Sequence, residues 1–408
     1  MTILTSASAS TEQPPVRLFA LATGVIVLSL YQAQPLIGQI GTSLGLSASV
    51  ADLVSTLTLM GYAAGLFLLV PLCDIFESRR LILFTLAANA LALLLAASPV
   101  PVAVFLAASF FTGLTATAIQ MLIPMAAAMS AESQRGRVIG NIMSGMMLGI
   151  MLSRPLASLI AGRFGWRMSY ALLAGAVVML MLALARAVPQ RQPQHPARYG
   201  ELISSLVTLW REEPILRRHA TSVALCFAAF NAFWSLVALR LAAAPFGLGT
   251  NGIALFALAG VSGAISAPLA GQLGDRGMSR MARSAAHIGI ALAMLLAWLG
   301  GGTPVLTAPT ARLAVLVIAA LLLDAGTIAD LTLGRRAVNL LRPEARGRIN
   351  GLFTGVIFVG GALGSAVAGI AWAHAGWRGV CLVALIFAAT ATCYGMQREP
   401  TRFVAITD

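Results

Sequence analysis

Long apolar runs recur along the whole chain and are separated by short polar segments. Each run is about twenty residues long, which as a helix is enough to cross the roughly 30 Å hydrocarbon core of a bilayer. The runs lack the alternation of apolar and polar residues that the strands of a membrane barrel require. We therefore expect twelve membrane-spanning helices, at residues 17–40, 51–73, 81–99, 102–126, 138–161, 168–186, 219–243, 251–273, 284–302, 310–333, 349–372 and 378–396.

The composition agrees with this pattern. Of 408 residues, 59% are hydrophobic and 10% are charged, and the mean hydropathy is +0.88. A soluble chain of this length would form two or three domains built from half-polar elements. The leader MTILTSASASTEQPPV has no basic segment, so the first span is expected to be retained and not cleaved. The sequence predicts an all-α membrane protein in contact with the lipid bilayer.

The placement of the basic residues predicts the orientation. All 27 are Arg. If both termini are cytoplasmic, 21 of them lie in cytoplasmic segments and four lie at the opposite ends of the spans. The positive-inside rule therefore places both termini and the linker 187–218 in the cytoplasm. The net charge of +13 is scattered over several such segments, and we expect no nucleic-acid partner.

The two halves of the chain resemble each other. The stretch RGRVIGNIMSGMMLGIML…FGWR from Arg135 aligns without gaps with RGRINGLFTGVIFVGGAL…AGWR from Arg346, and Asp74 corresponds to Asp275. Such a six-plus-six repeat places a binding cavity between two bundles near the bilayer midplane. We predict a cytoplasmic tail at 1–16, a six-helix bundle at 17–186, a linker at 187–218, a second bundle at 219–396 and a tail at 397–408.

The linker contains a predicted helix of its own. It opens with PQRQPQHP, which has too many prolines to be helical. In the following RYGELISSLVTLWREEP, apolar residues share one helical face: Leu202, Ile203, Leu206, Leu209 and Trp210. We expect a short helix that lies on the cytoplasmic membrane surface.

Several of these segments resemble a known family. The loops after spans two and eight share an Asp followed, after four residues, by Arg79 or Arg280, a pattern similar to motif A of the major facilitator superfamily. The stretches YQAQPLIGQI, GYAAGLFLLVPLCD, SGMMLGIMLSRPLASLIAGRFGWR and LLRPEARGRINGLF resemble its twelve-span drug/proton antiporter branch of bacterial inner-membrane efflux proteins. The resemblance covers residues 17–396. It implies the major facilitator fold, a small-molecule substrate, coupling to protons, no cofactor and a monomer.

The resemblance also implies a gate. In that family the acidic residue of motif A faces span eleven across the bundle interface. Here span eleven starts near Ile349, so Asp74 is expected to pair with Arg346 or Arg348 when the cytoplasmic side is closed. The predicted cytoplasmic gate comprises Asp74, Arg79, Arg80, Asp275, Arg346 and Arg348. The alternative is a solvated tight turn that only anchors the loop inside the cell.

Two charged residues lie deep in predicted spans, where a charge is costly. Arg154 in span five either lines the cavity and holds an anionic group or an Asp, or it reaches the outer surface or backbone carbonyls. Asp324 is near the middle of span ten, where desolvation favours its neutral form. It is therefore either a proton or substrate site or an interhelical hydrogen-bond partner. Asp330 lies nearer the inner surface, within expected reach of Arg335, and is assigned a structural role.

Other polar or amphipathic side chains occur at depths compatible with the cavity, and each is either a ligand contact or a link between helices: Gln32, Gln34, Gln120, Asn231 and Trp234. Small residues such as Gly149 are expected to let span five approach span eight closely. The four cysteines and four histidines form no ligand pattern, so we expect no metal. No catalytic constellation is present, and we expect no enzyme activity.

The function predicted from these features is proton-coupled efflux of small organic molecules by alternating access. An uncoupled facilitator or a metabolite importer of the same fold is the alternative. A membrane sensor or scaffold that has lost transport is a more remote one.

Overall fold

The computed structural model describes residues 15–190, 192, 198–303, 305–342 and 345–396. Within these ranges the regular elements are all helices. Most of the two predicted tails, and much of the proline-rich start of the linker, lie outside the described residues. The all-α fold predicted from the apolar runs is confirmed.

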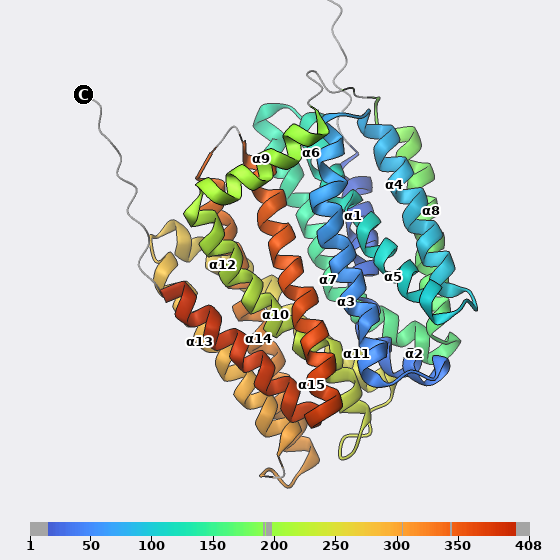
Figure 1. The fold of residues 1–408 in the computed structure, drawn as a ribbon, viewed down its shortest axis with the longest axis vertical. Coiled ribbons are helices and arrows are strands. Elements are labelled where there is room, and N and C mark those ends of the chain that lie inside the picture. Colours follow the sequence, from blue (N-terminus) through green and yellow to red (C-terminus); the bar gives the residue numbers. More distant parts are fainter. Residues whose placement is uncertain (1–14, 191, 193–197, 304, 343–344, 397–408) are drawn as a thin grey trace, which may run out of the picture.

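The first six spans form one bundle, drawn in blue to green in Figure 1. Glu77 caps the third span, because its carboxylate accepts hydrogen bonds from the backbone N–H groups of Arg79 and Arg80 at 3.0 and 3.1 Å. The helices of this bundle are α1 (Val16–Tyr31), η1 (Gln34–Leu36), α2 (Ile37–Leu44), α3 (Ala48–Leu68), η2 (Val70–Asp74), α4 (Ser78–Ala97), α5 (Val102–Ala116), α6 (Ala118–Ala128), η3 (Glu132–Gln134), α7 (Arg135–Phe164) and α8 (Trp166–Ala187).

The remaining spans form the second bundle, drawn in yellow-green to red, with α9 (Tyr199–Glu212) between the two. Its helices are α10 (Pro214–Ala242), α11 (Thr250–Ala257), η4 (Leu258–Gly260), α12 (Val261–Asp275), α13 (Ser279–Ala297), the π-helical turn η5 (Trp298–Gly302), α14 (Pro309–Asn339) and α15 (Arg346–Met396).

Helix α15 contains two membrane crossings. It has 51 residues, and Gly376 inside it adopts φ 57° and ψ −146°, which is not helical. A straight helix of that length would be about 75 Å long, more than twice the hydrocarbon thickness. Eleven helices among the described residues are long and apolar enough to cross a membrane when α15 is counted once. Dividing α15 at Gly376 gives the twelve crossings that the sequence predicts.

The repeat seen in the sequence recurs in the structure. Gly165, between α7 and α8, also has a positive φ, of 82°, and it is the repeat partner of Gly376. Each glycine precedes a tryptophan, Trp166 or Trp377, that is buried to the same extent. The same turn, which only glycine adopts at low cost, therefore joins the last two spans of each bundle.

Span five packs against span one in both halves. A Cβ on Gly149 would overlap the backbone oxygen of Gly24 in α1, and one on Gly360 would overlap that of Ala224 in α10. Gly149 itself faces α1, where the lack of a side chain lets α7 approach closely. Span five also contacts span eight, as expected. Span eight is approached further along α7, where Gly162 lies against Thr250.

Helix α9 crosses one end of the molecule and contacts both bundles (Figure 1). Its Tyr199 hydroxyl donates to the carbonyl of Leu68 at 3.1 Å. At its other end Arg342 donates to Glu213 at 2.6 Å and to Glu212 at 3.0 Å, and these hydrogen bonds raise the pKa of Arg342 above its usual value.

The apolar face of α9 is buried against protein, since Leu202, Leu206 and Leu209 are each less than a tenth exposed. The expectation that this face lies on the membrane surface is therefore wrong. We call the end of the molecule that carries α9 the α9 face, and the other end the opposite face.

Candidate functional site

A buried charged pair lies between the two bundles. Arg154 of α7 belongs to the first bundle and is 3% exposed, and Asp324 of α14 belongs to the second and is 4% exposed. Asp324 is the central residue of α14, which runs from Pro309 to Asn339. Both side chains are therefore buried, and Asp324 is too far from either end of α14 to reach solvent there.

Arg154 is held by polar and aromatic groups. Its Nε donates to Oε1 of Gln34 at 2.8 Å, and Nε2 of Gln34 donates to Oδ1 of Asn231 in the other bundle at 3.1 Å. The guanidinium carbon lies 4.3 Å from the ring centre of Trp234 and 5.4 Å from that of Phe230. These cation–π contacts stabilise the charge without neutralising it.

Asp324 has one direct hydrogen bond, in which Nε1 of Trp234 donates to its Oδ2 at 2.8 Å. Oδ1 of Asp324 and Nη1 of Arg154 both lie next to Gly260. A Cβ atom placed on that glycine would be 3.3 Å from the oxygen and 3.9 Å from the nitrogen. Among the described ion pairs none joins Arg154 to Asp324, so no nitrogen of the arginine lies within 4.0 Å of an oxygen of the carboxylate. Nη2 of Arg154 is buried without a hydrogen-bond partner. The two side chains carry opposite charges and lie close together, but they do not form a direct salt bridge.

A cavity of about 880 Å³ lies between the bundles at the α9 face. Gln120 is in its wall and donates to the hydroxyl of Tyr62 at 3.1 Å. From Tyr62 a series of aromatic rings in contact leads to the charged pair, through Phe358, Phe227 and Phe230, at centroid distances of 4.4, 5.2 and 5.4 Å. Neither Arg154 nor Asp324 lines the cavity, so these rings lie between it and the pair.

Three of the predicted gate residues surround the mouth of this cavity: Asp74, Arg346 and Arg348 line it and are exposed. Among the described ion pairs none joins Asp74 to either arginine. The other three lie elsewhere. Arg79 donates to the carbonyl of Ala185 within the first bundle, Arg80 pairs with Glu77, and Asp275 pairs with Arg336 within the second. The structure does not bring those three to the bundle interface.

At the opposite face the bundles are closed by a carboxylate that the sequence analysis did not consider. Asp52 of α3 is 1% exposed, and its Oδ2 accepts a hydrogen bond from Ser365 of α15 at 3.1 Å. Ser365 is also 2.9 Å from Ser235 of α10. A Cβ on Gly369 would lie 3.1 Å from the same carboxylate oxygen, so the two bundles are in tight contact here. Asp52 has a recognisable signal, a lone acid within an apolar run.

Asp330 does not pair with Arg335. It accepts a hydrogen bond from Arg283 of α13 at 2.8 Å, and Nε2 of His287 lies 3.2 Å from the same oxygen. Five residues along a helix turn the side chain by about 140°, which is why Asp330 and Arg335 face different ways. The expected pair is wrong, although Asp330 does stand in a buried ion pair.

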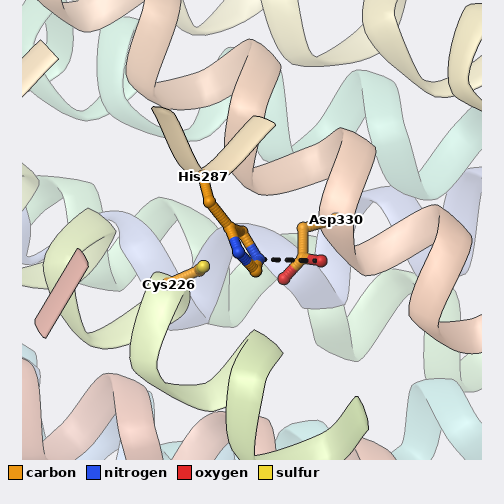
Figure 2. A group of neighbouring side chains, drawn as sticks. All are labelled: Cys226, His287 and Asp330. Atoms are coloured by element: carbon orange, nitrogen blue, oxygen red, sulfur yellow. Dashed lines mark ion pairs between the residues drawn. The ribbon is translucent and has the colours of Figure 1, made fainter. Parts of the chain in front are cut away.

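Cys226, His287 and Asp330 are neighbours inside the second bundle (Figure 2). Their potential ligand atoms lie within 4.8 Å of one another. Arg283 neutralises the carboxylate that a divalent cation would need for its own charge balance, so we assign the group to an ion-pair network that holds α13 and α14 together.

The remaining predicted cavity residues lie in three different places. Gln34, Asn231 and Trp234 contact the charged pair or each other, and Gln120 lines the cavity. Gln32 instead accepts a hydrogen bond from Ser169 at 3.2 Å within the first bundle, away from the interface.

Comparisons with known proteins identify the family. A sequence profile of the Major Facilitator Superfamily matches residues 19–329. The chain is 37% identical over 365 residues to "Uncharacterized transporter YgaY" of Escherichia coli O157:H7, covering 90% of each. It is 34% identical over 384 residues to "Probable transporter SCO4007" of Streptomyces coelicolor, covering 92% of this chain and 86% of that one.

Two solved structures share the fold. One is a bacterial homolog of the human lysosomal transporter Spinster, inward-facing and unoccupied, with a TM-score of 0.71 at 14% identity over 93% of this chain and 95% of that one. The other is the nucleoside transporter NupG, with 0.74 at 13% identity over 93% and 99%. The profile and the two relatives show that this chain belongs to the major facilitator superfamily and is a multi-pass membrane transporter of a small molecule, not an enzyme.

Proposed function

We propose that the protein is a proton-coupled exporter of small organic molecules that works by alternating access in the bacterial inner membrane, as a monomer with both termini in the cytoplasm. The observation that carries this proposal is the position of Asp324. It is a carboxylate at the centre of a membrane span, facing an arginine of the other bundle across the interface where the bundles move.

The surroundings of Asp324 support a role in proton binding. An ionised carboxylate buried in a membrane protein costs several kcal/mol unless it is paired or hydrated. Asp324 has one hydrogen bond from Trp234 and an opposite charge nearby that is not in direct contact. This partial compensation allows either protonation state, whereas the Arg283–Asp330 pair, with direct contact, favours only the ionised one.

Alternating access is supported by the difference between the two faces. The α9 face has a cavity of about 880 Å³ with exposed residues at its mouth, and the opposite face is closed at Asp52 and Ser365. From the arginine-rich segments we infer that the α9 face is cytoplasmic. The described conformation is then the one in which substrate enters from inside the cell.

The proton gradient is large enough for this task. One proton that moves inward under about 100 mV and one pH unit supplies roughly 3.7 kcal/mol. That is enough for a substrate gradient of about 500-fold.

Asp324→Asn tests the proposal. The amide keeps an oxygen that can accept the Trp234 hydrogen bond, and it mimics the protonated state permanently. We expect a folded protein that still exchanges substrate down its gradient but loses uphill efflux and the response to an imposed pH gradient. Transport is measured in proteoliposomes with a compound found by a thermal-shift screen of metabolites and antibiotics.

Glu201→Gln, an exposed site on α9, is the matched control and should leave coupling unchanged. If Asp324→Asn still concentrates substrate against its gradient, the proton binds elsewhere and Asp324 only links helices. Flux that is independent of pH in the wild type would favour the uncoupled facilitator.

A further inference from the structure

The charges in the wall of the cavity are unbalanced. Among its described lining residues the charged ones are Asp74, Arg335, Arg346 and Arg348. Asp74, Arg346 and Arg348 are exposed at the mouth, and the acid is close enough to Arg348 for the two charges to attract each other. Arg335 differs from them because it is half-buried and its position on α14 lies further inside.

Arg335 has a charge that no described residue neutralises. It takes part in none of the described ion pairs, and its Nε is buried without a hydrogen-bond partner. The nearest acid along its own helix, Asp330, is paired with Arg283. Tyr62, which lies near Arg335, is neutral, and its hydroxyl accepts a hydrogen bond from Gln120 of the cavity wall. A cation in this position attracts an anion from the cavity.

The rest of the wall is largely apolar and adaptable. Leu66 and Ile82 contribute branched aliphatic side chains, and Met121, Met125 and Met143 contribute flexible thioethers, which adjust to ligands of different shape. The volume of about 880 Å³ is that of a site for a drug-sized molecule.

We propose that the transported compounds are amphipathic organic anions, whose acidic group binds Arg335 while the apolar part contacts the methionine side of the cavity. This inference rests on the proposed function only in taking the cavity as the substrate pathway. An organic cation in the cavity would be repelled by Arg335, and among the described lining residues only Asp74, at the mouth, would attract it. Arg154 is not the anion site, because Asp324 already faces it.

Three naphthalene probes that differ only in the attached group test the proposal: 2-naphthoate, 2-naphthalenemethanol and 2-naphthylmethylammonium. Their binding to the purified full-length protein is measured, up to millimolar concentration, from the rise in unfolding temperature. The pH is the same throughout and no gradient is present. We expect 2-naphthoate to bind most tightly.

Arg335→Gln should weaken 2-naphthoate binding by about tenfold or more, the loss expected for a charge-assisted contact, and should leave the alcohol nearly unchanged. Arg335→Lys should restore part of the affinity. The control is Arg336→Gln, one position along the same helix, whose side chain pairs with Asp275 at the surface; it should bind 2-naphthoate like the wild type.

A second measurement uses the native Cys73 in the cavity wall, with the exposed Cys393 replaced by Ser. The ratio of its reaction rates with a sulfonate and a trimethylammonium methanethiosulfonate should fall in Arg335→Gln. Absence of 2-naphthoate binding, tighter binding of the amine, or an unchanged affinity in Arg335→Gln would each overturn the proposal. Because the binding assay involves no proton gradient, uphill transport that persists in Asp324→Asn while 2-naphthoate binding is intact would count against the proposed function alone.

Discussion

Replacing Asp52 by Ala should shift the protein toward the conformation that is open at the opposite face. The substitution removes the hydrogen bond that Ser365 donates to Asp52 across the bundle interface. A buried hydrogen bond of this kind contributes about 0.5–1.5 kcal/mol, which is a factor of roughly 2 to 12 in an equilibrium between two conformations. The lost packing against Gly369 acts in the same direction.

The matched control is Ser55→Ala, on the same helix and one turn away. Ser55 is also buried, but its hydroxyl has no hydrogen-bond partner, so its loss removes a polar group without removing a contact between the bundles. We expect this variant to have the conformational equilibrium of the wild type.

The equilibrium can be measured as the distance distribution between spin labels at positions 50 and 251, one on each bundle at the opposite face. Both residues are exposed, and Cys73 and Cys393, which are not buried, are first replaced by Ser. The fraction of the longer distance should rise about 2- to 12-fold in Asp52→Ala. An unchanged distribution, or the same change in Ser55→Ala, would show that the Asp52 contact does not hold this face closed.

Two further predictions concern the α9 face. Asp74→Asn should slow transport by about 5- to 150-fold, the range of an ordinary conformational coupling, with normal expression, because an exposed residue at the cavity mouth acts on the closed state and not on core packing. Unchanged rates would leave Asp74 only its role as a loop anchor. A topology reporter fused after Arg198 should report the cytoplasm, and a periplasmic signal there would falsify the proposed orientation.

The fold could be predicted from the sequence because its determinants are local. The length of an apolar run alone indicates a membrane span. The repeat is visible in the sequence because the same turn requires a glycine, Gly165 or Gly376, before a tryptophan, Trp166 or Trp377. What α9 contacts could not be predicted in this way. An apolar helical face is equally suited to lipid and to protein, and only the three-dimensional arrangement shows that Leu206 is covered by protein.

The site could be predicted only in part. Arg154 and Asp324 attract attention singly because a charge inside a membrane is costly. Their partners could not be inferred, because Gln34 is 120 positions from Arg154 and Trp234 is 90 from Asp324. Proximity in sequence was misleading for Asp330, whose partner comes from another helix. Because Asp330 pairs with Arg283, Arg335 has no ion-pair partner among the described residues.

The contact between α3 and the first half of α15 has a mechanical consequence. Tyr62, near the middle of span two, lies against Phe358, and Phe67, at the end of α3, lies against Gly355. Asp52 and Asp74 then stand at the ends of two lever arms, each about 15–18 Å long at 1.5 Å per residue. A tilt of about 15° around the middle moves both ends by roughly 4 Å in opposite directions. We therefore expect one small rotation to break the Asp52 contact as it carries Asp74 toward Arg348, so that the two ends are not open at once.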